Sequence, residues 1–207
     1  MSLLKDILIS PEEYNRLPYI LDNADLESSN GQDIKDIISL FRKHKLPQAF
    51  KPKLVHKHYD IGDDEVMVSR EIPVPTHGVV SIMGPMISQR APTLRGLHYF
   101  VDGNGDLQAY EYTIGPAPDI CRYDDFFKEF SDFIVERNLQ NKLGLVIGDE
   151  RNDKRIWREI EVPDKRGTIM IPDNVGLEKL GLKEDRESWY NSLWHPLRRR
   201  RIPTGNE

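Results

Sequence analysis

Residues 96–113 read GLHYFVDGNGDLQAYEYT, and this stretch decides the fold class. The polar segment DGNGD at residues 102–106 separates two aromatic runs in which apolar and polar side chains alternate. Alternation of this kind is typical of half-buried strands, and Asn104-Gly105 accepts the positive φ angles of a tight two-residue turn. The stretch therefore predicts an antiparallel β-hairpin.

The register of this hairpin predicts a pair of chemically active side chains. Counting outward from a two-residue turn places Phe100 opposite Ala109. The same count places His98 opposite Glu111. Directly opposite residues lie about 5 Å apart at Cβ, so Glu111 can orient His98 and favour its charged form, as a catalytic base and its orienting partner require. The alternative is a surface charge pair without a catalytic role.

Alternating patterns predict further strands at residues 53–61, 65–70, 78–83, 143–148, 155–162 and 168–172. The last three are joined by polar turns and are expected to form a three-stranded meander. Residues 84–92 have no clear period, which predicts a long loop that can cover a site.

Three helices are predicted from capping signals and from the spacing of apolar residues. Ser10 followed by Pro11 indicates the start of the first helix. Apolar residues recur at helical spacing over residues 34–41, and an aromatic helix spans residues 123–138 with a left-handed stop at Asn138. Together these elements predict an α+β fold: a predominantly antiparallel sheet, curved or barrel-like, with about three helices packed on it.

We expect a single domain over residues 1–207, because a chain of this length buries enough apolar surface to fold without covalent staples. Within it, residues 1–50 form an N-terminal helical segment that packs on the sheet. Residues 53–115 form a β-rich part, residues 120–172 contribute the aromatic helix and the meander, and residues 178–207 form an irregular tail.

Charge and composition narrow the function classes. The net charge of −5 comes from 29 basic and 34 acidic residues, which disfavours a general nucleic-acid surface. The lone Cys121 cannot form an intrachain disulfide, and no run of eighteen or more apolar residues occurs. We therefore expect an intracellular, cytoplasmic protein without a membrane partner. The positive charge is concentrated near one end, in Arg198, Arg199, Arg200 and Arg201.

The sharpest chemical signal is the sequence His56-Lys57-His58-Tyr59-Asp60. On a strand, alternate residues share one face, so the two imidazoles line up as they do in many mononuclear metal sites. Glu65 follows and supplies a carboxylate, which makes His56, His58 and Glu65 the candidate metal ligands. The alternative places both histidines on the wetter face of a half-buried strand.

The order His56, His58, Glu65 and His98 resembles the donor order of cupins, whose barrels bind metal through a His-x-His pair, a nearby Glu and a later His. This resemblance implies a divalent metal on a β-barrel. The spacing departs from the family pattern, because Glu65 lies farther from His58 and the glycine expected before the histidine pair is absent.

Three functions are compatible with these patterns. The leading hypothesis is a non-catalytic protein that binds an unknown small molecule or protein, because no catalytic constellation is complete. The alternative is a metal-assisted or acid–base enzyme that acts on a small molecule through His56, His58 and His98, with Glu65 or Glu111 as the carboxylate partner. The third is a nuclear or nucleic-acid-associated factor that uses the arginine run.

Overall fold

The computed structural model describes residues 4–5, 7–23, 29–74, 78–90, 93–116, 118–148, 157–162, 166–172 and 200–201. Among these residues, ten strands form one sheet, and eight of the strands are five residues or longer. The strands are β1 (Leu4–Lys5), β2 (Phe50–Leu54), β3 (Glu65–Val74), β4 (Gly78–Ile87), β5 (Leu94–Val101), β6 (Leu107–Ile114), β7 (Leu143–Ile147), β8 (Trp157–Val162), β9 (Gly167–Pro172) and β10 (Arg200–Arg201).

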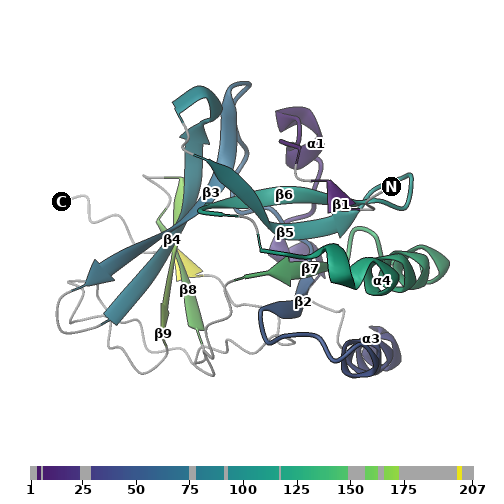
Figure 1. Cartoon of the computed structure of the whole chain (residues 1–207). Coiled ribbons are helices and arrows are strands. Elements are labelled where there is room, and N and C mark those ends of the chain that lie inside the picture. The colour runs from purple at the N-terminus through teal and green to yellow at the C-terminus, as the bar shows by residue number, and fades with distance from the viewer. Residues whose placement is uncertain are drawn as a thin grey trace, which may run out of the picture.

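The sheet is mostly antiparallel and curled (Figure 1). Its order is β10-β8-β9-β4-β3-β6-β5-β7-β2, and β1 pairs with β6 beside this path. The parallel pairs are β1 with β6, β3 with β6, and β10 with β8. An α+β fold with a curled, mostly antiparallel sheet is confirmed.

The α-helices of the described chain are α1 (Pro11–Asn15), α3 (Gly31–Lys43) and α4 (Asp124–Glu136), and the 3-10 turns are η1 (Ile20–Asn23), η2 (Ser88–Arg90) and η3 (Cys121–Tyr123). The Ser10 hydroxyl accepts from the Glu13 amide at 3.1 Å, which caps α1 as predicted. Asn138 has a φ of 54° just after α4, so the predicted left-handed stop is confirmed. No helix within the described ranges is long and apolar enough to cross a membrane.

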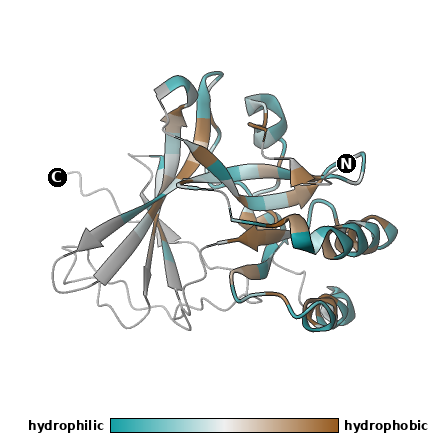
Figure 2. Cartoon of the chain, in the orientation of Figure 1, coloured by the Kyte–Doolittle hydropathy of each residue, from teal (hydrophilic) through white to brown (hydrophobic). Residues whose placement is uncertain are grey.

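Ring contacts link α3 to α4, and one ring of β2 to α4. Phe41 of α3 meets Phe126 and Phe130 of α4 edge-on, with ring centroids 5.1 and 6.2 Å apart. Phe50 of β2 stacks on Phe127 of α4 at 6.1 Å. Figure 2 shows that hydrophobic residues run along β7 and recur in α4. This part of the core therefore rests on ring contacts between α4 and its neighbours.

The β5–β6 hairpin is confirmed, but its turn differs from the prediction. The Asp102 amide donates to the Asp106 carbonyl at 2.8 Å, so three residues form the loop, and of these Gly105 alone has a positive φ, at 82°. Phe100 consequently pairs with Gln108 and not with Ala109. Register shifts on both sides of His98 then place it opposite Glu111, as predicted.

Three other predictions about the sheet are wrong. The strand predicted at residues 53–61 ends at Leu54, and the chain then runs irregularly to β3. The loop predicted at residues 84–92 begins as strand, because β4 continues to Ile87, and the 3-10 turn η2 follows over Ser88–Arg90. The meander is also incorrect: β7 pairs with β2 and β5, whereas β8 pairs with β9.

Gly144 of β7 is a site of close backbone approach, and Gly144→Ala should be strongly destabilising. A Cβ atom at this position would overlap the carbonyl oxygen of Tyr99 and lie 3.1 Å from Val55 Cγ2. We expect a loss of about 2–3 kcal/mol in the free energy of unfolding, measured by urea denaturation.

Gly103→Ala is the matched control, because a Cβ there meets nothing within 4 Å. Its effect should stay below about 1 kcal/mol. Equal losses in the two variants would contradict the close packing of β5 against β7.

Candidate functional site: a buried histidine–glutamate centre

Five ionisable side chains from distant parts of the chain meet inside the protein, and we call them the buried centre. They are His56, His58, His98, Glu111 and Glu159, each with 6 % or less of its surface exposed. His98 comes from β5, Glu111 from β6 and Glu159 from β8, and the two other histidines come from the connection that follows β2. The alternatives that placed these groups on a wet strand face or at the surface are therefore wrong.

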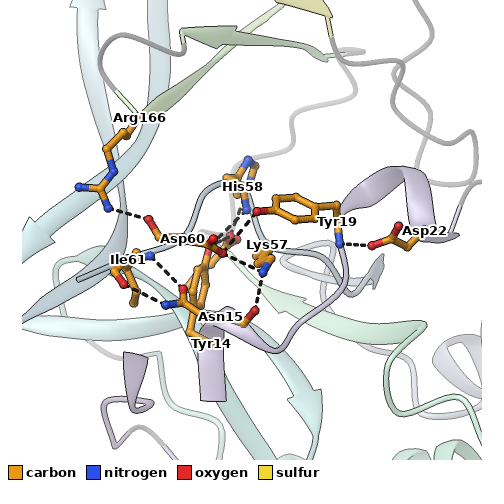
Figure 3. A network of polar contacts seen from close by, with 10 residues as sticks. Tyr14, Asn15, Tyr19, Asp22, Lys57, His58, Asp60, Ile61 and Arg166 are labelled. Atoms are coloured by element: carbon orange, nitrogen blue, oxygen red, sulfur yellow. Dashed lines mark hydrogen bonds and ion pairs between the residues drawn. The ribbon is translucent and has the colours of Figure 1, made fainter. Parts of the chain in front are cut away.

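The connection between β2 and β3 is anchored by polar contacts to α1 and to the start of β9 (Figure 3). The Lys57 ammonium donates to the Asn15 carbonyl and to Asp60 Oδ1, the latter at 2.8 Å. The Asn15 side chain bonds both backbone groups of Ile61 at 2.9 Å. Arg166 donates to the Asp60 carbonyl at 2.6 Å. These contacts fix an irregular segment whose two histidines are buried.

Three side chains contact the Glu111 carboxylate, two of them through hydrogen bonds and one through an ion-pair contact. The Tyr14 hydroxyl of α1 donates to its Oε1 at 3.3 Å, and His58 Nε2 lies 3.3 Å from the same oxygen. His98 Nδ1 donates to Oε2. Burial is the largest single influence and would raise the pKa of Glu111, but His58 and His98 together outweigh it and hold this pKa well below the ordinary value. Glu111 is therefore an anion in the protein interior.

His58 lies between two carboxylates. Its Nδ1 is 2.8 Å from Glu159 Oε1 and 3.1 Å from the Thr168 hydroxyl of β9, while its Nε2 faces Glu111. Burial would lower the pKa of His58, but Glu111 and Glu159 reverse this and raise it above the ordinary value. In the absence of a bound ion, His58 is thus the cation that the two carboxylates stabilise.

His98 has the opposite electrostatic character. Burial, assisted by the charge of Lys53, lowers the pKa of His98 to about 4 despite its contact with Glu111. Its imidazole is neutral at physiological pH, and its Nδ1 hydrogen is directed at Glu111 because a carboxylate can only accept.

His56 completes a group of possible metal ligands. Its Nδ1 lies 3.0 Å from the Leu54 carbonyl, which fixes the tautomer with Nδ1 as donor and directs the lone pair to Nε2. The rings of His56 and His58 are 5.1 Å apart. One ligand atom from each of His56, His58 and Glu159 lies within 4.8 Å of the other two.

The structure brings together four of the five predicted site residues. Glu65 is the exception, because it forms two hydrogen bonds with Arg166, at 3.0 and 2.7 Å, and a third with the Gly62 amide. Glu159 is the carboxylate beside the histidine pair, and sequence reasoning missed it. In the WREIEV run of β8, Glu159 and Glu161 lie two residues apart and so share one face of the strand, and nothing local indicates that Glu159 is the buried one.

The arginine run is described only in part. Arg200 and Arg201 form β10, whereas Arg198 and Arg199 lie outside the described residues. Its use for nucleic-acid binding or nuclear import stays a prediction.

The buried centre predicts a maximum of stability near pH 6.5 in metal-free protein. Because the pKa of His98 is about 4 in the folded protein and 6.5 ordinarily, the unfolded chain binds the extra proton first as the pH falls. About 3 kcal/mol of stability should be lost between pH 6.5 and 4. The raised pKa of His58 affects stability above pH 6.5. The charged His58 stabilises the folded protein fully below pH 6.5, and this contribution is lost as the pH rises through the folded-state pKa.

Urea denaturation across pH 4–8 measures this profile. His98→Gln should remove most of the loss between pH 6.5 and 4. His44→Gln is the control, because His44 contacts Glu129 away from the buried centre, at 2.7 Å, and this variant should keep most of the loss seen between pH 6.5 and 4. If the free energy of unfolding falls equally between pH 6.5 and 4 in the wild type and in His98→Gln, His98 is not the cause of this loss.

No protein-family model, curated protein or solved structure matches the chain.

Proposed function

We propose that this protein binds one divalent first-row metal ion through His56, His58 and Glu159. The observation that carries the proposal is the convergence of these three donors within 4.8 Å in the protein interior. Two of these donors, His56 and His58, are metal ligands that the sequence predicts, and Glu159 takes the place predicted for Glu65.

The chemistry of the donors fits such an ion. Two imidazoles and one carboxylate are a common ligand set for Zn²⁺ and for non-haem Fe²⁺. Bonds of about 2.1 Å in tetrahedral geometry put ligand atoms roughly 3.4 Å apart, so small side-chain rotations bring the three into range.

The surroundings of the donors support the same proposal. A metal-binding histidine usually donates a hydrogen bond from the N–H of its second ring nitrogen to a carbonyl or a carboxylate, which orients the ring. His56 Nδ1 faces the Leu54 carbonyl, and His58 Nε2 faces Glu111. Both rings therefore have the orientation typical of metal-binding histidines, and His56 Nε2 and His58 Nδ1 are the proposed coordinating atoms.

The charge of the buried centre supports a cation as well. Glu111 and Glu159 are at most 1 % exposed, and burying a carboxylate costs several kcal/mol unless the charge is offset. The proton on His58 offsets one such charge. A bound dication offsets both. The competing explanation is a purely structural ion-pair network, which needs no metal.

Elemental analysis and Co²⁺ titration test the proposal. Protein purified without chelators should carry about one equivalent of metal, and the chelated protein should bind one Co²⁺ with d–d absorption bands. Glu159→Gln should weaken Co²⁺ binding by at least about tenfold, because a carboxylate ligand is lost.

Glu65→Gln is the matched control, since Glu65 pairs with Arg166 apart from the three donors. It should bind Co²⁺ like the wild type. The proposal fails if the wild type binds no Co²⁺, or if both glutamate variants weaken binding equally.

A metal-assisted enzyme is the second candidate function. Three protein ligands leave a coordination position open for water or substrate, as catalytic zinc sites do. His98 and Glu111 adjoin the donors, where a neutral imidazole can accept a proton. In an activity screen of the Co²⁺-loaded protein, His98→Ala should abolish turnover and keep Co²⁺ bound. Activity that survives this change would remove His98 from the reaction.

We also infer that the chain forms one domain in which helices pack on the curled sheet. The ring contact of α4 with β2 supports helix packing. β1 pairs with β6 and β10 pairs with β8, so strands from both ends of the chain belong to one sheet, which supports a single domain.

A further inference from the structure

A pocket of about 370 Å³ lies where the ends of β2 and β7 meet the segment that joins β6 to α4. Phe50 and Tyr123 contribute aromatic surface, and Pro116 and Pro118 contribute aliphatic surface. The two aromatic rings are in edge contact, with centroids 4.9 Å apart. Volume and lining fall within the range of small-molecule sites, which are mostly apolar with a few placed polar groups.

The polar groups of this pocket are two arginines and one aspartate. Arg95 of β5 is only 4 % exposed, and its Nη1 donates to the Ile147 carbonyl at 2.9 Å and to the Gly96 carbonyl at 3.5 Å. These bonds hold the Arg95 guanidinium in a fixed orientation at the wall of the pocket.

Arg122 of η3 supplies the second cation. Its guanidinium lies over the Tyr123 ring, 4.9 Å from the centroid. Asp119 supplies the single carboxylate among the lining residues. The lining therefore carries an excess of one positive charge beside aromatic and proline surface.

We propose that this pocket binds a small organic carboxylate whose body is apolar or aromatic. The planar guanidinium of arginine matches the two oxygens of a carboxylate, and a rigid arginine loses little entropy on binding. The rings and prolines accept the body of the ligand. Free phosphate also binds arginine, but it has no apolar part to fill the rest of the pocket.

Benzoate is the probe, and benzamide is its uncharged analogue of nearly the same shape. We expect benzoate, titrated into the full chain and followed by amide chemical shifts in NMR, to bind at least about tenfold more tightly than benzamide. The shifts should centre on the pocket residues.

Arg122→Gln should reduce benzoate affinity about fivefold or more and leave benzamide binding unchanged. Arg122 lies on the protein surface, so this variant should fold. Arg42→Gln is the matched control, an exposed arginine at the end of α3 that does not line the pocket.

Three results would overturn the proposal: equal binding of benzoate and benzamide, equal effects of the two arginine variants, or tighter binding of inorganic phosphate than of benzoate. The pocket shares no residue with the buried centre. The outcome is therefore independent of whether the protein binds a metal.

Discussion

The charge on Glu111 is the constraint to which the interior of this protein is adapted. A carboxylate with 0 % exposure is costly unless donors replace the water it has lost. Tyr14 from α1, His58 from the connection after β2 and His98 from β5 supply those donors. The contacts that stabilise this one buried anion therefore link the N-terminal segment and the connection after β2 to the β5–β6 hairpin.

An irregularity of β5 makes this arrangement possible. With the three-residue turn, Tyr99 pairs with Ala109, and a regular ladder would set His98 opposite Tyr110. The register shifts on either side of His98 set it opposite Glu111. The two shifts cancel, because Gly96 pairs with Tyr112 in the same register as Tyr99 with Ala109. The irregularity is therefore local, and it decides which side chain lies opposite Glu111.

Local patterns predicted the hairpin, the cap at Ser10 and the stop at Asn138, because each depends on neighbours within a few residues. They failed where distant residues decide. The burial of His58 depends on Glu159 and Thr168, about a hundred residues further along, and no spacing near His58 reveals them. The turn is a different case, because its determinant is local: the Asp102 carboxylate accepts from the Asn104 and Asp106 amides and stabilises the longer loop.

The pocket and the buried centre both include a residue of β5. Arg95 and His98 are three residues apart in this strand, and both contact β7: the Arg95 side chain donates to the Ile147 carbonyl, and His98 pairs with Val146 in the ladder. Directly after His98, the Tyr99 carbonyl approaches Gly144 so closely that no side chain fits there. Because close-packed interiors resist gradual deformation, this contact fixes the β5 backbone against β7 next to both places. The pocket and the buried centre are therefore adjacent along one rigid part of the sheet, although no residue belongs to both.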